Sequence, residues 1–215
     1  MGSLCTLTSA FEVPKRSADE WARINREVAA FERREADRRR RERVERSGIP
    51  ARYRRAVLDG CPPEVAAWCA KPARPLMLRG EVGLGKTWAA CAALIALASE
   101  RSVVFATLRQ VADEARAAEW GENALARYRN AGALCIDDLG KDRMTESRLS
   151  LLFEIVKARD ESGKPTIYTT NYPWEDMVRR LMVGEDISLV KTITSRLQRC
   201  LVVDFKGTDR RLRHG

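Results

Sequence analysis

The chain has 215 residues, of which 45% are hydrophobic and 32% are charged, and this composition excludes a wholly disordered protein because it supplies enough apolar material for one core. Lysine and arginine outnumber aspartate and glutamate by 39 to 30, and the resulting formal charge of +9 favours a polyanionic partner. The six cysteines form no CxxC pair and the one histidine is His214, which excludes a Cys/His zinc site and argues against a disulfide framework.

The N-terminal segment is predicted to form an Arg-rich helical arm. Ser17 and Glu20 have the spacing of a capping box, which begins a helix. Apolar residues then follow at 3-4-3 spacing, which places one stripe on a helical face: Trp21, Ile24, Val28 and Phe31. Between positions 16 and 46 there are 11 arginines against 8 acidic residues. This helix is either a solvated surface helix or a docking arm for a partner protein or nucleic acid.

From residue 76 onward, short apolar runs alternate with amphipathic stretches. Strands are predicted over residues 76–78, 102–107, 133–136, 166–170 and 201–205. Helices are predicted over residues 86–99, 108–118, 123–129, 145–162, 174–182 and 189–199. Alternating strands and helices predict an α/β fold in which helices cover both faces of a parallel sheet, making three layers.

No membrane or export segment is expected. The first ten residues contain neither a basic region nor a continuous apolar run. The longest apolar run, residues 89–98, is about half the length needed to cross a bilayer. We therefore expect a cytoplasmic protein without a membrane anchor.

The clearest chemical signal is a glycine-rich loop. Residues 80–87, GEVGLGKT, match the pattern G-x-x-x-x-G-K-[ST] between a predicted strand and an Ala-rich helix. Backbone N–H groups in such a loop surround phosphates at a helix N-terminus. Lys86 is expected to neutralise phosphate charge, and the Thr87 hydroxyl is expected to bind Mg²⁺. The residues expected to contact the nucleotide are Gly80, Glu81, Val82, Gly83, Leu84, Gly85, Lys86, Thr87 and Trp88.

Two later strands end in polar residues that fit the same site. Asp137 and Asp138 follow the apolar run ALCI, and a buried strand would place Asp137 beside Mg²⁺. Asp138 is then positioned to polarise the attacking water. Asn171 follows the strand TIYTT, and its amide is suited to hold that water or the γ-phosphate. Taken alone, the Asp pair also fits a helix cap or a turn.

In this order, these motifs resemble those of the AAA+ ATPases. They resemble more closely the bacterial helicase-loader family typified by DnaC, with the transposition helper IstB as a near relative. The resemblance covers about residues 47–213. Besides the glycine-rich loop, it rests on the segments SGIPARY (47–53), IDDLG (136–140), TTN (169–171), TSRL (194–197) and VDFKGTDR (203–210).

The resemblance implies a P-loop AAA+ domain over residues 47–215, preceded by the arm at residues 1–46. It implies that Asp137 is the metal-side carboxylate of Walker B and that Asn171 is sensor 1. It also implies that Arg196 is an arginine finger, which completes the nucleotide site of a neighbouring copy in a homo-oligomer. Taken alone, Arg196 also fits a surface salt bridge. Arg210 would make a sensor-2-like contact.

One departure from the family pattern concerns Asp138. The family usually carries glutamate there, and aspartate is one methylene shorter. Because displacement of a catalytic group by about 1 Å costs about 100-fold in rate, slow ATP hydrolysis is predicted.

The resemblance implies an ATP-dependent helicase loader. It would bind ATP, Mg²⁺ and single-stranded DNA, and its arm would grip a hexameric replicative helicase. Arg109, Lys141 and Arg143 are candidates for a DNA-facing surface. Two alternatives remain: an IstB-like transposition helper that acts on duplex DNA, and a nucleotide-gated adaptor with negligible hydrolysis.

Overall fold

The computed structural model of the chain describes residues 17–119, 123–184 and 187–209. The chain divides into two compact units, residues 1–38 and residues 39–215. In the described ranges, no helix combines the length and apolar character that a membrane span requires.

Helix α1 (Ala18–Glu45) begins at the predicted capping box. The Ser17 N–H donates to Glu20 Oε2 at 2.8 Å, and the Glu20 N–H donates to Ser17 Oγ at 3.2 Å. Within the first unit, the apolar stripe lies open to solvent, since the exposed fraction is 47% for Trp21, 49% for Val28 and 62% for Phe31. The predicted helix is confirmed, and most of its stripe is exposed.

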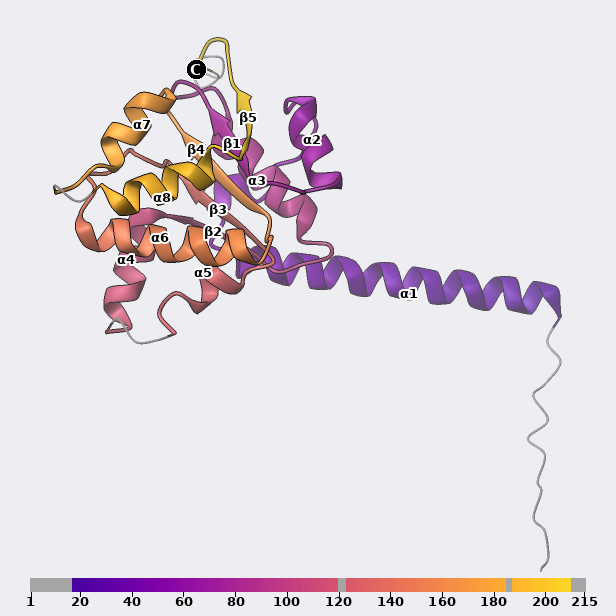
Figure 1. The fold of residues 1–215 in the computed structure, drawn as a ribbon. Helices are drawn as coiled ribbons and strands as arrows, with labels where there is room; N and C mark the ends of the chain where they lie inside the picture. The colour runs from indigo at the N-terminus through magenta and orange to yellow at the C-terminus, as the bar shows by residue number, and fades with distance from the viewer. Residues whose placement is uncertain (1–16, 120–122, 185–186, 210–215) are drawn as a thin grey trace, which may run out of the picture. The chain divides into compact units, whose positions relative to one another are not determined.

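The described strands form one sheet of five parallel strands in the order β2-β3-β4-β1-β5. They are β1 (Leu76–Arg79), β2 (Val103–Thr107), β3 (Ala133–Asp137), β4 (Thr166–Thr170) and β5 (Leu201–Asp204). Because β4 lies between β1 and β3, the residues that follow these three strands meet at one edge of the sheet (Figure 1).

Helices cover both faces of this sheet, as predicted (Figure 1). One core contains side chains of α2 (Pro63–Ala70) and α3 (Lys86–Leu97), together with every second strand residue, such as Leu76 and Leu78. The other core contains alternate strand residues, such as Met77 and Ile136, and side chains of five helices. These are α4 (Leu108–Ala117), α5 (Ala126–Asn130), α6 (Glu146–Glu161), α7 (Trp174–Leu181) and α8 (Ser188–Leu197). Alternate strand residues facing opposite layers explain why most strand residues are apolar and buried.

Two short elements were not predicted, the helix α2 and the 3-10 turn η1 (Ala51–Tyr53). Both follow prolines, Pro62 before α2 and Pro50 before η1. No helix or strand was assigned to residues 51–70 from the sequence, so both elements were found only in the structure.

The last turns of α1 belong to the second unit, where two arginines bond to the carboxyl end of α3. Arg40 Nε donates to the Ile95 carbonyl oxygen at 3.2 Å. Arg43 Nη1 donates to the carbonyl oxygens of Ala98 and Ser99, each at 2.9 Å. Carbonyls at a helix C-terminus lack partners within the helix, and cations stabilise them. Part of the Arg-rich run is therefore structural.

Candidate nucleotide-binding site

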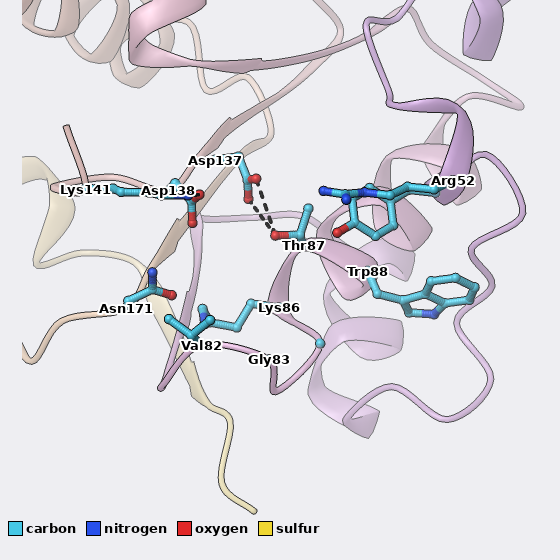
Figure 2. A pocket seen from close by; sticks show the side chains of 12 residues that line it. Arg52, Val82, Gly83, Lys86, Thr87, Trp88, Asp137, Asp138, Lys141 and Asn171 are labelled. Atoms are coloured by element: carbon cyan, nitrogen blue, oxygen red, sulfur yellow. Dashed lines mark hydrogen bonds and ion pairs between the residues drawn. The ribbon is translucent and has the colours of Figure 1, made fainter. Parts of the chain in front are cut away.

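A cavity of about 510 Å³ opens at the sheet edge where β1, β3 and β4 end (Figure 2). It collects side chains from the glycine-rich loop, the start of α3, the ends of two neighbouring strands and η1. The lining residues are Arg52, Tyr53, Val82, Gly83, Gly85, Lys86, Thr87, Trp88, Asp137, Asp138, Lys141 and Asn171. Residues from four separate parts of the sequence therefore line one cavity.

The loop between β1 and α3 needs its glycines. Gly83 and Gly85 have φ angles of 84° and 96°, a region that side-chain-bearing residues rarely adopt. A Cβ at Gly80 would collide with the carbonyl oxygen of Phe205 after β5. Gly85 is the N-cap of α3, so the unbonded N–H groups of the first helical turn lie beside the cavity. This end of α3 is suited to an anion.

Lys86 brings a positive charge into this hollow. Its side chain is buried, and Nζ donates to the Glu81 carbonyl oxygen at 2.7 Å. Burial of an ammonium group is unfavourable unless anions or acceptors compensate it. A lysine at this place therefore fits a phosphate-bearing ligand.

Asp137, at the end of β3, is the centre of a hydrogen-bond network. The Thr87 hydroxyl donates to Asp137 Oδ1 at 3.1 Å (Figure 2). From β4, the Thr169 hydroxyl donates to the same oxygen at 2.6 Å and accepts the Asp138 N–H at 2.8 Å. Burial raises the pKa of Asp137, while the hydrogen bonds from Thr169 and Thr87 lower it. The two threonines thus stabilise the charged form of a buried carboxylate.

Sequence reasoning missed Thr169 as a residue of the site. Its side chain is fully buried, and it joins both aspartates although it does not line the cavity. The available signal was a threonine near the carboxyl end of a fully buried strand, where a hydroxyl needs a hydrogen-bond partner.

Asp138 has a left-handed backbone with φ of 57°. Its carboxylate accepts from Lys141 Nζ at 2.6 Å, and this contact raises the pKa of Lys141. Lys141, a candidate for a DNA-facing surface, lines the cavity beside Asp138 and is 60% exposed (Figure 2). Its contact with DNA stays a prediction. Asn171 lines the same cavity directly after β4.

The remaining residues of the predicted loop set have different positions. Val82, Gly83, Gly85 and Trp88 line the cavity, whereas Gly80, Glu81 and Leu84 do not. Leu84 is buried in the core, and Glu81 contributes its carbonyl oxygen to Lys86. Arg210 lies outside the described residues.

Arg52 and Tyr53 also line the cavity, with the Arg52 guanidinium 4.7 Å from the Tyr53 ring centroid. The sequence singled out their segment only as a family marker.

Arg196 lies at the opposite edge of the sheet. It is near the end of α8, just before β5 begins, whereas the nucleotide loop follows the end of β1. Its Nε is 3.3 Å from Asp160 Oδ2, and its Nη1 donates to the Thr192 carbonyl oxygen at 3.2 Å. Arg196 therefore does not contribute to the cavity of its own protomer, and its contact with a second copy stays a prediction.

The site residues fit ATP with Mg²⁺ in their chemical types. Lys86 and the N-terminus of α3 supply positive charge for phosphates. Thr87 and Asp137 supply oxygen ligands at 3.1 Å from each other. Mg²⁺ in nucleotide sites typically takes one or two protein oxygens and completes its shell with phosphate and water. Across the described ranges, no cluster of three or more His, Cys, Asp or Glu side chains forms a metal site of protein ligands alone.

The chain matches one known protein family and is similar to several solved structures. The family model described as IstB-like ATP binding protein matches residues 66–215. No curated protein sequence is matched.

Three solved structures illustrate the likeness. The DnaC helicase loader has a TM-score of 0.60 at 24% identity, over 73% of this chain and 100% of that chain. DnaI has a TM-score of 0.65 at 19% identity, over 76% of this chain and 95% of that chain. AMPPCP-bound DnaA from Aquifex aeolicus has a TM-score of 0.60 at 17% identity, over 77% of this chain and 54% of that chain. At these identities the likeness concerns the fold, which is the P-loop AAA+ fold that the sequence predicts.

Proposed function

The chain belongs to the IstB-like ATP binding protein family, and from that premise we propose that it is a cytoplasmic ATPase that loads a replicative DNA helicase. The observation that carries the ATPase proposal is the cavity shared by Lys86, Thr87, Asp137 and Asn171. The likeness to the DnaC helicase loader, which spans the whole of that chain, supports the loading role.

In the proposed reaction, Lys86 neutralises charge on the terminal phosphates, and Asn171 orients the γ-phosphate or the attacking water. Thr87 and Asp137 would hold Mg²⁺, which would neutralise negative charge on the phosphates. Thr169 keeps the Asp137 carboxylate oriented and ionised through its 2.6 Å hydrogen bond.

Asp138 polarises the attacking water and limits the rate. Its side chain is one methylene shorter than the usual glutamate, and Lys141 Nζ donates to its carboxylate at 2.6 Å. Both features support slow turnover, because the shorter side chain holds the carboxylate further from the water and Lys141 occupies one of its two oxygens. Arg196 of a neighbouring copy stabilises the charge that develops on the γ-phosphoryl group.

The turnover proposal is tested by Asp138→Ala. We expect loss of ATP hydrolysis with little change in ATP affinity, measured by phosphate release and by binding of a fluorescent nucleotide. Asp142→Ala is the matched control, since Asp142 is an exposed acidic residue in the same loop that does not line the cavity. Hydrolysis at the wild-type rate by Asp138→Ala would remove Asp138 from the mechanism.

The arm at residues 1–46 docks the helicase through its apolar stripe. Trp21 and Phe31 are large and exposed, as expected for anchors that enter a groove on a partner. Trp21→Ala combined with Phe31→Ala should abolish capture of the hexameric helicase in a pull-down, whereas Arg23→Ala on the same helix should not.

A deletion test should remove residues 1–38 rather than 1–46. Removal through residue 46 would also delete Arg40 and Arg43, which bond to α3, and Val44, which lies in the core. Helicase capture that survives deletion of 1–38 would contradict the docking role.

The ATPase domain binds single-stranded DNA while the helicase is transferred. An electrostatic groove predicts that DNA affinity falls steeply with salt. The family description favours a second candidate, a transposition helper on duplex DNA. Tighter binding to duplex than to single strands, without helicase capture, would select it. The Asp138–Lys141 ion pair favours a third, a nucleotide-gated adaptor, which binds ATP without measurable turnover with or without DNA.

A further inference from the structure

The chain that follows β5 packs against the glycine-rich loop. β5 lies beside β1 to its last residue, where Asp204 is paired with Arg79, and the Phe205 N–H then donates to the Arg79 carbonyl oxygen at 2.7 Å. A Cβ at Gly80, the first residue of the loop, would collide with the Phe205 carbonyl oxygen. The segment 205–209 therefore begins in direct contact with the loop that holds the nucleotide site.

The same segment brings a carboxyl group against Gly83. A Cβ at Gly83 would overlap the Asp209 side chain, and its three nearest atoms would be the Cγ and both carboxylate oxygens of Asp209. Gly83 lines the nucleotide cavity, whereas the half-buried Asp209 does not. The Asp209 carboxylate therefore lies against a residue of the cavity wall without filling the cavity.

A turn at Gly207 brings Asp209 to this position. Gly207 has a φ of 128°, a conformation that residues with side chains rarely adopt, and a Cβ there would meet no atom within 4 Å. The backbone turn therefore requires glycine, although the space around it would admit a side chain. A substitution at Gly207 strains the turn that places Asp209 and leaves the Asp209 charge intact.

A carboxylate at this place opposes the ligand that the loop is suited to bind. The loop and the first turn of α3 present N–H groups to phosphates, and Lys86 adds a positive charge. An anion held against the same loop reduces the positive potential there and repels phosphate oxygens. The repulsion grows with the charge of the ligand, so it weakens the binding of a triphosphate more than that of a diphosphate.

We propose that Asp209 sets the affinity of the site for nucleotides, and that it lowers the affinity for ATP more than the affinity for ADP. This inference rests on the proposed ATPase function. It assigns a role to a residue that neither the loop pattern nor the cavity lining identifies. Changes in affinity at one site arise mostly in the dissociation rate, so the Asp209 charge favours release and exchange of the nucleotide.

Asp209→Asn removes the charge and keeps the shape of the side chain. One pair of partly exposed charges changes an equilibrium by up to about fivefold, and ATP carries several negative charges, so we expect this variant to bind a non-hydrolysable ATP analogue about three- to tenfold more tightly. The gain for ADP should be smaller, and calorimetric titration measures both. Asp209→Glu should bind as weakly as the wild type. Asp59→Asn is the matched control, since Asp59 is an exposed acidic residue that does not line the cavity.

Two further measurements separate an effect of charge from a structural role. The difference between Asp209→Asn and the wild type should shrink between about 0.1 M and about 1 M salt, because the Debye length falls from about 10 Å to about 3 Å. Gly207→Ala should also tighten binding of the analogue. Combining it with Asp209→Asn should add little, because both changes remove the same contact.

Several outcomes would overturn the inference. They are equal affinity of Asp209→Asn and the wild type for the analogue, an equal gain for the ATP analogue and ADP, and a gain that persists in about 1 M salt. Weaker binding by Asp209→Asn would also overturn it, because Asp209 would then support the loop rather than oppose the phosphates. If circular dichroism shows both proteins folded and neither binds the analogue, the proposed function itself fails.

Discussion

Replacement of Thr169 by valine tests the site through a residue that does not line the cavity. Valine has nearly the shape of threonine, so the change removes the hydroxyl without creating a hole. Two hydrogen bonds are lost: the 2.6 Å bond to Asp137 and the 2.8 Å bond from the Asp138 N–H. We expect Thr169→Val to lower both the free energy of unfolding and ATP turnover.

The magnitude follows from these two bonds. A hydrogen bond to a charged group contributes about 1.5–3 kcal/mol, and an orphaned buried donor costs about 1–3 kcal/mol. Burial of the added methyl group offsets about 0.8 kcal/mol. The free energy of unfolding should therefore fall by about 2–5 kcal/mol. Loss of a partner that orients a metal-side carboxylate typically lowers metal affinity or activity about 10–100-fold.

Urea denaturation measures the stability change, and phosphate release at saturating ATP measures turnover. Thr169→Ser keeps the hydroxyl and should restore most of both quantities. Thr192→Val is the matched control, because the half-buried Thr192 donates its hydroxyl to a carbonyl oxygen within its own helix, away from the cavity. If Thr169→Val unfolds at the wild-type urea concentration and hydrolyses ATP at the wild-type rate, the Thr169 network has no role in the site.

Three further changes test the framework around the site. Arg159→Met should lower the free energy of unfolding, measured by thermal denaturation, by about 3–5 kcal/mol. This arginine is buried, which lowers its pKa to about 10, and it donates to carbonyl oxygens just before β3 and β4. A free energy of unfolding within about 1 kcal/mol of the wild type would contradict that role. Arg40→Ala combined with Arg43→Ala should lower the free energy of unfolding, measured by urea denaturation, by about 1–2 kcal/mol. Alanine at the exposed Arg39 and Arg41 should change it little. Arg79 on β1 lowers the pKa of Asp204 by donating a hydrogen bond to it. The stability that this ion pair contributes is therefore present above the unfolded-state pKa of Asp204 and is lost as pH falls through its folded-state pKa. Asp204→Asn should therefore reduce the stability difference between pH 7 and pH 3, by less than about 1 kcal/mol because the pair is partly exposed.

The elements around the nucleotide site could be predicted because each has a local signal. The strands over β3 and β4 are apolar runs that end in polar residues, and α3 follows a loop pattern with few other uses. Once the strands were known to be parallel, their carboxyl ends had to meet at one edge. The meeting of Lys86, Asp137 and Asn171 in one cavity also requires the strand order, in which β4 lies between β1 and β3, and no local signal gives that order.

The supporting contacts could not be predicted because they join residues far apart in the chain. Asp160 and Arg199 are 39 positions apart, and Arg43 and Ser99 are 56 positions apart. Neither pair has a spacing rule, since side-chain periodicity constrains neighbours on one element only. Lys141 illustrates the same limit: its charge was visible, but its ion pair with Asp138 depends on how the backbone turns after β3.

The same contacts change what the net charge of +9 implies about DNA. In the Arg-rich run of α1, Arg38 pairs with Glu35, and Arg40 and Arg43 bond to carbonyl oxygens of α3 or the residues after it. A guanidinium already held by protein acceptors releases fewer counterions on binding phosphate than a solvated one, because it must first give up those bonds. The slope of DNA affinity against salt reports the phosphates that are newly neutralised. That slope should therefore be smaller than a count of basic residues implies.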